Sequence, residues 1–278
     1  MPPTAIVLRP VSTADLDACH ALSAAVGWAH RLADWRWMTG FGRGAVADMA
    51  GEIVGTTLWW LYGETAASVG MVIVRPDWQG FGIGRRLVET ALADLGDRTA
   101  VLVATDAGEP LYARLGFADA GRVRQQQGIA RAPDLPPASL RPLRPGDIEA
   151  VIALDHAAKG MRRAVAIAAL AEAGDGMVLT EGAGITGFGF CREAGLGRVI
   201  GPVVAPDAAG ARALIGHWLA RHAGTVLRVD TPADSAIGDW LAAHGLGLAG
   251  TGIVMTRGRR PPTGTGARSF ALINQGLG

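Results

Sequence analysis

The two halves of this 278-residue chain resemble one another, and this internal repeat constrains the possible folds more than any other feature. Residues 8–18 match residues 140–150, with five of the eleven pairs identical and three more conservative. Two shorter matches follow in the same order and at nearly the same spacing. They pair Val74–Asp77 with Val204–Asp207 and Leu115–Phe117 with His244–Leu246. Because self-similarity at one spacing is typical of a duplicated unit, we interpret the chain as one module present twice.

A short segment between the halves separates the two copies. Residues 131–139 contain three prolines and no apolar period, which is typical of a linker. We therefore expect a first module over 1–130, a linker over 131–139 and a second module over 140–278.

The pattern inside the first copy predicts a mixed α/β module. A short strand leads through a polar cap into a helix. Three runs rich in Val, Ile, Thr and Trp then read as consecutive antiparallel strands, and two helical segments flank one further strand. The three runs are 45–50, 53–62 and 66–74; the helices are 83–95 and 109–115, and the further strand is 100–104. The expected fold class is α/β: two tandem modules, each a mixed, mainly antiparallel sheet flanked by helices.

Composition excludes several classes of function. Lysine plus arginine total 26 and aspartate plus glutamate 25, so charge gives no reason to expect nucleic acid as a partner. Lys159 is the only lysine, which removes any motif that needs Gly-Lys, such as the P-loop. Cys19 and Cys191 form no ligand cluster, so neither a metal site nor a disulfide is expected. With no signal-like N-terminus and no long apolar run, we expect a cytoplasmic protein without membrane contact.

The segment with the clearest chemistry is a glycine-rich loop between a strand and a helix. Gly80, Gly82 and Gly84 allow close approach of a ligand, and the first turn of the following helix offers free N–H groups at its positive end. Arg85 and Arg86 add positive charge. The segment therefore predicts a pyrophosphate site at residues 80–85, although a glycine turn that only packs helix on strand is the alternative. A dinucleotide-binding loop is disfavoured, because G-x-G-x-x-G would require glycine at position 85 and a parallel sheet.

These residues resemble a known acyltransferase motif. Gln79–Gly84 fits the pattern (Gln/Arg)-x-x-Gly-x-(Gly/Ala) by which the GNAT superfamily of N-acyltransferases binds acyl-CoA. Pro110–Phe117 resembles the family's Leu-Tyr-x-x-x-Gly-Phe element, and both occur in the expected order within 5–130. Further segments, including Ile200–Ala205, are similar to a bacterial subgroup in which a degenerate GNAT-like domain follows the first.

The resemblance implies an N-acetyltransferase that uses acetyl-CoA, without a metal, and acts by direct attack of an amine in a ternary complex. It implies that Tyr112 protonates the departing thiolate. It also implies that strand backbone holds the pantetheine arm and supplies an oxyanion donor. Thr105 stands where the family has an asparagine, which puts one coenzyme contact in doubt. The implied coenzyme-binding residues are Val72, Ile73, Val74, Gln79, Gly80, Phe81, Gly82, Ile83, Gly84, Arg85 and Thr105.

The general base and the acceptor are less clear. Ser68 stands where many members carry a glutamate, so deprotonation through water is the expectation. His30, Asp34 and Glu64 are candidates that more often cap helices or lie on the surface. Several tryptophans near the expected acceptor side indicate either an apolar or cationic pocket or ordinary core packing. They are Trp28, Trp35, Trp37, Trp59 and Trp60, and only one of the last two can face the acceptor.

We expect the acceptor to be the amine of a small metabolite. A non-catalytic acyl-CoA sensor and a protein or peptide acetyltransferase are the alternatives. The second copy keeps one glycine of three in its loop, Ala208–Leu214, and has Leu241 at the tyrosine position. We therefore expect it to bind no coenzyme, and instead to shape the acceptor pocket or form a homodimer contact. Arg162 and Arg163 are expected to be solvated, with an anionic group on the acceptor as the alternative.

Overall fold

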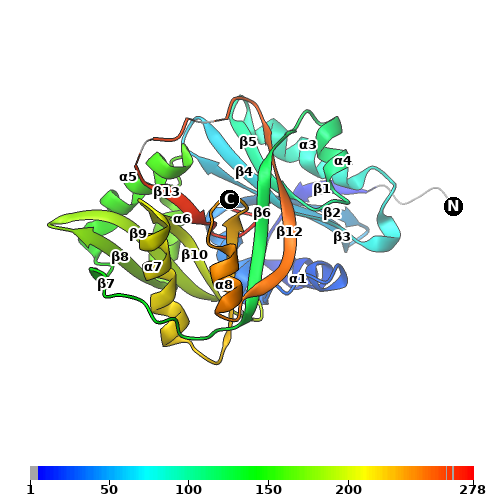
Figure 1. Ribbon diagram of the computed structural model, residues 1–278. Coiled ribbons are helices and arrows are strands. Elements are labelled where there is room, and N and C mark those ends of the chain that lie inside the picture. Colours follow the sequence, from blue (N-terminus) through cyan, green and yellow to red (C-terminus); the bar gives the residue numbers. More distant parts are fainter. Residues whose placement is uncertain (1–5, 261, 265) are drawn as a thin grey trace.

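The computed structural model describes residues 6–260, 262–264 and 266–278 (Figure 1). Within these residues, thirteen strands belong to one sheet that runs without interruption through both copies. None of the helices in the described part of the chain is long and apolar enough to cross a membrane.

The two copies contain the same succession of elements, which confirms the tandem α/β prediction. The expected strands and helices of the first copy appear within a few residues of their predicted bounds. The first copy contains β1 (Val7–Pro10), α1 (Leu16–Ala25), α2 (Leu32–Phe41), β2 (Arg43–Met49), β3 (Glu52–Tyr62), β4 (Ala66–Val74), α3 (Ile83–Leu95), β5 (Thr99–Ala104), α4 (Glu109–Arg114) and β6 (Ala118–Ile129). The second contains β7 (Leu140–Pro142), α5 (Ile148–Lys159), α6 (Ala164–Ala173), β8 (Asp175–Glu181), β9 (Gly184–Ala194), β10 (Gly197–Ala205), α7 (Ala208–Arg221), β11 (Val226–Pro232), α8 (Gly238–Ala243), β12 (Gly247–Arg257) and β13 (Arg268–Ala271).

The match between residues 8–18 and 140–150 is explained by an ion pair that occurs at the first turn of each copy. Arg9 donates two hydrogen bonds to the carboxylate of Asp15, at 2.8 and 2.7 Å. Arg141 donates two to Asp147 in the same way, at 2.6 and 2.9 Å. Such bidentate pairs are directional as well as charged. They fix the angle at which the first strand turns into the first helix, which explains why both partners occur in both copies.

The two copies exchange a strand at the centre of the sheet. The strand order is β1-β2-β3-β4-β5-β12-β6-β11-β10-β9-β8-β7, so β12 lies between β5 and β6 (Figure 1). The antiparallel neighbour of β5 is therefore β12 of the second copy, and that of β11 is β6 of the first. Residues 131–139 contain no helix or strand between them, but Leu135 packs closely against Gly216 of α7.

Helices cover both faces of this sheet. On one face of the first copy, α3 buries Leu87, Val88 and Ala91 against the strands; each large aliphatic side chain buried in this way contributes about 1.5–3 kcal/mol. On the opposite face, α1 and α2 share a single core with α5 and α6 of the second copy. The two halves of the chain therefore share buried surface as well as strands.

One arginine in this shared core corrects an expectation. Arg163 was expected to be solvated, but its side chain is 0% exposed and donates to both carboxylate oxygens of the equally buried Asp155, at 2.9 and 2.6 Å. It also donates to the carbonyl oxygen of Gly278. A buried guanidinium needs such partners, because an unpaired charge away from water is strongly destabilising. Cys19 and Cys191 are buried free thiols, as predicted.

In each copy two parallel strands pair briefly and then separate. In the first, β4 and β5 pair at Ala66–Ser68 with Thr99–Val101, and no further pairing follows in the described residues. A bulge interrupts β4 two residues later, and Met71 adopts a φ of 52°, which is rare for a side chain of this size. The carboxyl-terminal half of β4 thereby leaves an open gap beside β5.

The corresponding gap of the second copy is occupied. There β10 and β11 pair at only two described positions, Arg198 with Leu227 and Val199 with Arg228. Beyond them, β13 pairs with β10 through residues 268–271, and the N–H of Leu272 donates to the carbonyl oxygen of Asp230. The chain thus closes its own second gap and leaves the first one open.

Candidate active site

The glycine-rich loop lies at the carboxyl end of β4 and leads directly into α3. Gly80 and Gly82 have φ values of +84° and +76°, a region that side chains with a Cβ rarely adopt. Gly82 is the N-cap residue, immediately before the first residue of α3. Only a glycine-rich sequence allows the chain to turn this sharply between the strand and the helix.

This loop carries a run of unused hydrogen-bond donors. Within the described residues, the backbone N–H groups of residues 80–85 have no hydrogen-bond partner. They include the first turn of α3, where the helix dipole adds partial positive charge. An arrangement of this kind binds phosphate groups.

The side chains of the loop are arranged around these donors. Gln79 donates from Nε2 to the carbonyl oxygen of Val74 at 3.1 Å and so ties the loop to the end of the strand. The guanidinium of Arg85 pairs with Glu89 at 2.7 Å, but both side chains are exposed, so this weak pair leaves the guanidinium able to bind a ligand. Phe81 is 71% exposed, with its ring centroid 6.0 Å from that of Trp78.

The edge of β4 beside the gap contains the three strand residues expected to contact coenzyme. Val72, Ile73 and Val74 follow the bulge at Met71, where β4 no longer pairs with β5. Backbone groups on this edge lack the sheet partners that a continuous parallel ladder would supply. The strand therefore offers a template for an extended ligand.

Tyr112 lies on α4, close to the end of β5. The turn into α4 is closed by Thr105, whose Oγ accepts from the N–H of Gly108 at 3.2 Å. The ring of Tyr112 is buried and packs edge-on against Phe117, with centroids 5.9 Å apart. Its hydroxyl has no hydrogen-bond partner in the described part of the chain, and burial raises the pKa of Tyr112 well above its ordinary value. The hydroxyl is therefore protonated at neutral pH and free to donate.

A cavity of about 400 Å³ opens where β4 and β5 separate. Met71, Val103 and Thr105 line it from the first copy, and Arg192 and Arg228 line it from the second. The tail that follows β13 forms another wall: Gly276 packs so closely on Gly70 that a Cβ on Gly70 would lie 2.8 Å from its Cα. Both copies and the tail thus enclose one space beside the gap.

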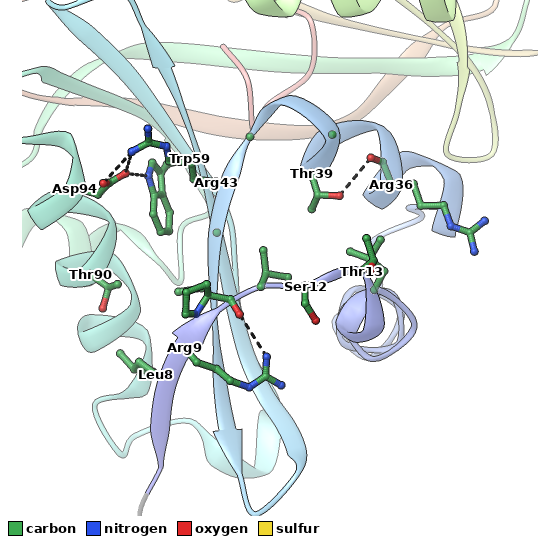
Figure 2. A pocket seen from close by; sticks show the side chains of 17 residues that line it. Leu8, Arg9, Ser12, Thr13, Arg36, Thr39, Arg43, Trp59, Thr90 and Asp94 are labelled. Atoms are coloured by element: carbon green, nitrogen blue, oxygen red, sulfur yellow. Dashed lines mark hydrogen bonds and ion pairs between the residues drawn. The ribbon is translucent and has the colours of Figure 1, made fainter.

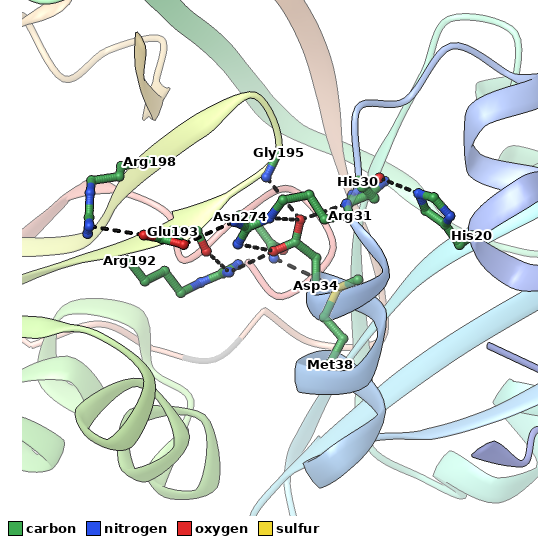
Figure 3. A network of polar contacts seen from close by, with 10 residues as sticks. All are labelled: His20, His30, Arg31, Asp34, Met38, Arg192, Glu193, Gly195, Arg198 and Asn274. Carbon is green, nitrogen blue, oxygen red and sulfur yellow. Dashed lines mark hydrogen bonds and ion pairs between the residues drawn. The ribbon is translucent and has the colours of Figure 1, made fainter. Parts of the chain in front are cut away.

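Side chains around this cavity form a polar network between the copies (Figure 3). Asp34 of α2 accepts from the backbone N–H groups of Arg31 and Gly195, each at 2.9 Å, and from Arg192 at 3.3 Å. Burial raises the pKa of Asp34, but these hydrogen bonds outweigh burial and hold its pKa below the ordinary value. Asp34 is therefore a structural anion that joins the first copy to the β9–β10 hairpin.

The candidate bases are not arranged for proton abstraction. Ser68 donates from Oγ to the hydroxyl of Tyr62 at 3.0 Å, and both side chains are buried. His30 lines the cavity, but burial, followed by the charge of Arg228, lowers its pKa to about 4. Glu64 lies exposed in the turn between β3 and β4, away from the cavity lining.

The tryptophans divide between the core and the cavity. Trp28 lines the cavity. Trp59 and Trp60 face opposite sides of β3, as expected, but both are buried in cores and neither lines this cavity. Trp35 is buried with its Nε1 donating to Ser23, whereas Trp37 stacks on Arg192, with the guanidinium carbon 4.0 Å from the ring centroid.

A larger cavity of about 640 Å³ lies elsewhere in the first copy (Figure 2). It is lined by residues of β1, by the end of α2 and by Arg43, Trp59 and Asp94. Asp94 is already engaged by Arg43 at 2.8 Å and by the indole of Trp59 at 2.7 Å. Neither β4 nor β5 contributes to its lining, whereas both line the cavity of about 400 Å³ beside the gap, so its size does not make it the site of the chemistry.

The second copy replaces the loop with a closed helix start. Asp207 accepts from the N–H of Gly210 at 2.8 Å and thereby places its own carboxylate at the start of α7. Its counterpart in the repeat, Asp77, pairs with Arg75 at 2.7 Å and lies six residues before α3. The residue that precedes α3 is Gly82, which has no side chain to cap the helix. A carboxylate at this point both uses a donor and repels a phosphate.

Family models match both copies. An acetyltransferase (GNAT) domain model matches residues 41–119 and a second model of the same description matches residues 151–271, so together they span more than half of the chain. The chain belongs to the GNAT acetyltransferases. The GNAT family uses acetyl-CoA, and the tandem arrangement inferred from the repeat agrees with the two matches.

Known GNAT proteins resemble this chain over most of its length. The uncharacterized N-acetyltransferase YitH of Bacillus subtilis is 28% identical over 237 residues, which cover 83% of each chain. A crystal structure from Pyrococcus horikoshii, described as an acetyltransferase, has a TM-score of 0.82 at 17% identity and covers 98% of this chain and 96% of its own. A GCN5-related N-acetyltransferase from Sphaerobacter thermophilus has a TM-score of 0.64 at 17% identity, over 93% and 97% of the two chains. At these identities the two structures establish a shared fold.

Sequence reasoning missed the part of this GNAT site that comes from far along the chain. Arg192, Arg198 and Arg228 reach the cavity from β9, β10 and β11 of the second copy, and Asn274–Gly276 from the tail. No spacing or motif marks these residues. Only the folded arrangement of the two copies brings them to the same cavity as Met71.

Proposed function

We propose that this GNAT protein transfers the acetyl group of acetyl-CoA to the primary amine of a small metabolite, at one active site in the first copy. The observation that carries this proposal is the contrast between the two copies. The first has six adjacent free N–H groups beside an open gap between parallel strands. The second has a carboxylate at the helix start and a strand in the gap.

The residues of the first copy fit acetyl-CoA. The N–H groups of residues 80–85 offer hydrogen bonds and partial positive charge to a diphosphate. The free edge of β4 from Val72 to Val74 offers backbone groups to an extended amide-containing arm. The exposed side chain of Arg85 adds positive charge, since its exposed pair with Glu89 is weak.

Two groups of this chain act on the reacting atoms in the proposed reaction. Bound acetyl-CoA supplies the acetyl group as a thioester, and transfer forms an amide C–N bond as the C–S bond breaks. Tyr112 holds a proton that its hydroxyl donates to the departing sulfur. A backbone N–H on the edge of β4 stabilises charge on the carbonyl oxygen.

The proton of the amine leaves through water rather than to a side chain. Ser68 is committed to Tyr62, and Asp34 accepts from two backbone N–H groups and from Arg192. His30 is a weak base, because its pKa lies near 4. Binding both substrates in one site still accelerates the reaction, since proximity and orientation contribute up to about 7–11 kcal/mol.

The size of the cavity supports a small acceptor. A volume of about 400 Å³ falls within the range of roughly 300–1,000 Å³ that is typical of small-molecule sites. Residues of both copies and of the tail surround it. This enclosure disfavours a protein or peptide tail as the acceptor.

Calorimetry with acetyl-CoA tests where the coenzyme binds. We expect one equivalent per chain. Gly84→Glu places a carboxylate at the second residue of α3, where a Cβ has room, and should weaken binding at least about 100-fold by repelling the diphosphate. Ala209→Glu makes the same change at the second residue of α7, where the side chain is exposed, and should leave binding unchanged.

An acceptor screen that follows CoA release tests the transfer itself. Release that depends on a small amine supports the proposed function. Binding of two equivalents, or loss of binding in Ala209→Glu alone, would overturn the assignment to the first copy. Tight binding without amine-dependent CoA release would instead indicate a sensor of acyl-CoA.

A further inference from the structure

The cavity beside the gap is unusually rich in arginine. Arg192, Arg198 and Arg228 all line it, whereas Asp34 is the only carboxylate among its described lining residues. All three arginines come from the second copy, whereas Met71, Val103 and Thr105 line the cavity from the first. The wall that the second copy forms therefore carries three guanidinium groups.

Each arginine of this wall has one acidic partner, and the partners differ in burial. Asp34 is 3% exposed and accepts from Arg31, Gly195 and Arg192. The other two lie outside the lining: Asp230 is 0% exposed and pairs with Arg228 at 2.7 Å, whereas Glu193 pairs with Arg198 at 3.2 Å and is 64% exposed to solvent. An exposed pair of this kind is weak and screened by salt, so it leaves Arg198 able to bind a ligand.

Two of the arginines retain unused donors. Arg192 is 5% exposed, and its Nε is buried without a hydrogen-bond partner in the described part of the chain. Arg228 donates from Nε and Nη2 to Asp230, and its Nη1 donates to no described residue. A buried donor without a partner costs free energy, and such groups in native proteins are rare unless a ligand or water completes them.

The rest of the lining is partly apolar and partly uncharged polar. The apolar residues are Trp28, Met38, Met71, Val103 and Val199, and the amide side chains are those of Gln125, Gln127, Asn274 and Gln275. An acceptor that fills this space therefore meets apolar surface and amide groups as well as the guanidinium groups of the second copy. Because like charges repel, a protonated amine is disfavoured at the arginine end and favoured at the gap beside β4.

We infer that the acceptor is an amine that also carries an anionic group, a carboxylate or a phosphate, and that the arginines of the second copy bind that group. This inference rests on the proposed function, because it places the acceptor in the cavity beside the coenzyme gap. The planar guanidinium presents paired N–H donors that match the two oxygens of a carboxylate or phosphate. The second copy then supplies specificity for the acceptor while the first supplies coenzyme binding and proton donation.

The primary experiment compares amines that differ only in the anionic group. Initial rates of CoA release are measured with 4-aminobutyrate against butylamine, with phosphoethanolamine against ethanolamine, and with each common amino acid against its decarboxylated amine. We expect kcat/KM for at least one anionic member to exceed that of its neutral counterpart by about 10- to 100-fold, the size of one charged hydrogen bond. The first and second pairs distinguish a carboxylate from a phosphate.

Variants of the arginine wall connect this preference to the cavity. Arg198→Gln should raise KM for the preferred anionic amine by about 10- to 100-fold and leave KM for its neutral counterpart and for acetyl-CoA unchanged. Arg198→Lys keeps the charge and should restore part of the affinity. Arg228→Gln provides a second test, and Arg221→Gln, which changes an exposed arginine of α7 outside the cavity, is the matched control.

The outcomes separate this inference from the proposed function. Equal or better use of neutral amines, or a rise in KM for both members of a pair in Arg198→Gln, overturns the inference and leaves the acetyltransferase activity intact. If no amine releases CoA although acetyl-CoA binds, the proposed function fails. Calorimetry with 4-aminobutyrate and phosphoethanolamine then decides the inference: binding to the wild type that Arg198→Gln and Arg228→Gln abolish supports an anion site, and no binding overturns it.

Discussion

At the scale of single residues, the proposed reaction depends most on Tyr112. Its hydroxyl is protonated, lacks a partner in the described structure and lies on a helix that begins where β5 ends. We expect Tyr112→Phe to lower kcat by about 10²–10⁴-fold, because the departing sulfur then receives its proton from water. The ring remains packed on Phe117, so acetyl-CoA affinity should change little. Steady-state rates with the best acceptor, together with calorimetry, give both values.

The control for Tyr112 comes from the other tyrosine in the chain. Tyr62 donates to the carbonyl oxygen of Leu277 at 2.8 Å in the shared core. Tyr62→Phe should therefore lower stability rather than kcat of the folded protein. Unaltered kcat in Tyr112→Phe would remove Tyr112 from its proposed role.

His30, which lines the cavity beside the gap, should make the free energy of unfolding depend on pH. Its pKa is about 4 when folded and near 6.5 when unfolded, so the unfolded chain binds the proton more strongly between these values. The contribution of His30 to the free energy of unfolding is therefore fully present above about pH 6.5 and is lost as the pH falls toward 4. We expect this loss to reach about 2–3 kcal/mol.

Urea unfolding of His30→Gln at pH 6.5, 5.5 and 4.5 measures this contribution. The variant should lose less stability than the wild type as the pH falls. His156→Gln is the matched control, because this histidine of α5 is exposed to solvent, and its unfolding should follow the wild type. Parallel pH profiles for His30→Gln and the wild type would contradict the assignment.

The geometry of the glycine-rich loop could be predicted because its signal is local. Glycines with positive φ, a strand before them and a helix after them lie within one short stretch of sequence, so spacing alone predicts their geometry. Arg192 and Arg228 carry no such signal. Each is an ordinary strand arginine until the fold brings it to the cavity, and the burial of Arg163 could be inferred only once Asp155 was placed beside it.

At the scale of elements, the same strand–loop–helix unit has two outcomes. In the first copy Asp77 turns to Arg75 and the helix start stays open, whereas in the second Asp207 caps it. The loss of glycines from the second loop predicts that it cannot bind coenzyme. The occupation of its gap by β13 was not predictable, because that contact joins segments far apart in the sequence.

The junction of α5 and α6 carries a second prediction at this scale. Asp155 and Arg163 are each 0% exposed and pair with one another in the core that both copies share. Asp155→Asn should lower the free energy of unfolding by about 3–5 kcal/mol, because it leaves a buried guanidinium without its counter-charge. Denaturant unfolding measures the change.

A double variant distinguishes loss of the pair from loss of packing. Asp155→Leu combined with Arg163→Met removes both charges and keeps similar volume, so it should recover most of the stability lost in Asp155→Asn. A double variant that is less stable than Asp155→Asn would indicate that the pair has a further role, such as holding Gly278 through the hydrogen bond from Arg163.

At the scale of the whole molecule, the exchange of β6 and β12 makes the two copies interdependent. The repeat in the sequence predicts two similar modules and a linker, and the order of elements agrees with that. It does not predict which copy supplies the sixth strand, because strand pairing between copies and within a copy satisfies the same hydrophobic pattern. The proposed acceptor cavity is lined by residues of β4 and β5 from the first copy and of β9, β10 and β11 from the second.

This interdependence predicts how the halves behave when they are separated. Residues 1–139 alone would leave β5 without β12, β6 without both of its neighbours, and the core of α1 and α2 without α5 and α6. Exposed strand edges and exposed core surface favour aggregation over folding. We therefore expect residues 1–139 alone to lack a cooperative unfolding transition and to bind no acetyl-CoA, although they contain the whole glycine-rich loop and Tyr112.

Co-expression with residues 140–278 should restore a one-to-one complex that binds one equivalent of acetyl-CoA. Size-exclusion chromatography, circular dichroism melting and calorimetry test each step, and a monomeric first half that melts cooperatively and binds coenzyme would show that the exchanged strands are dispensable.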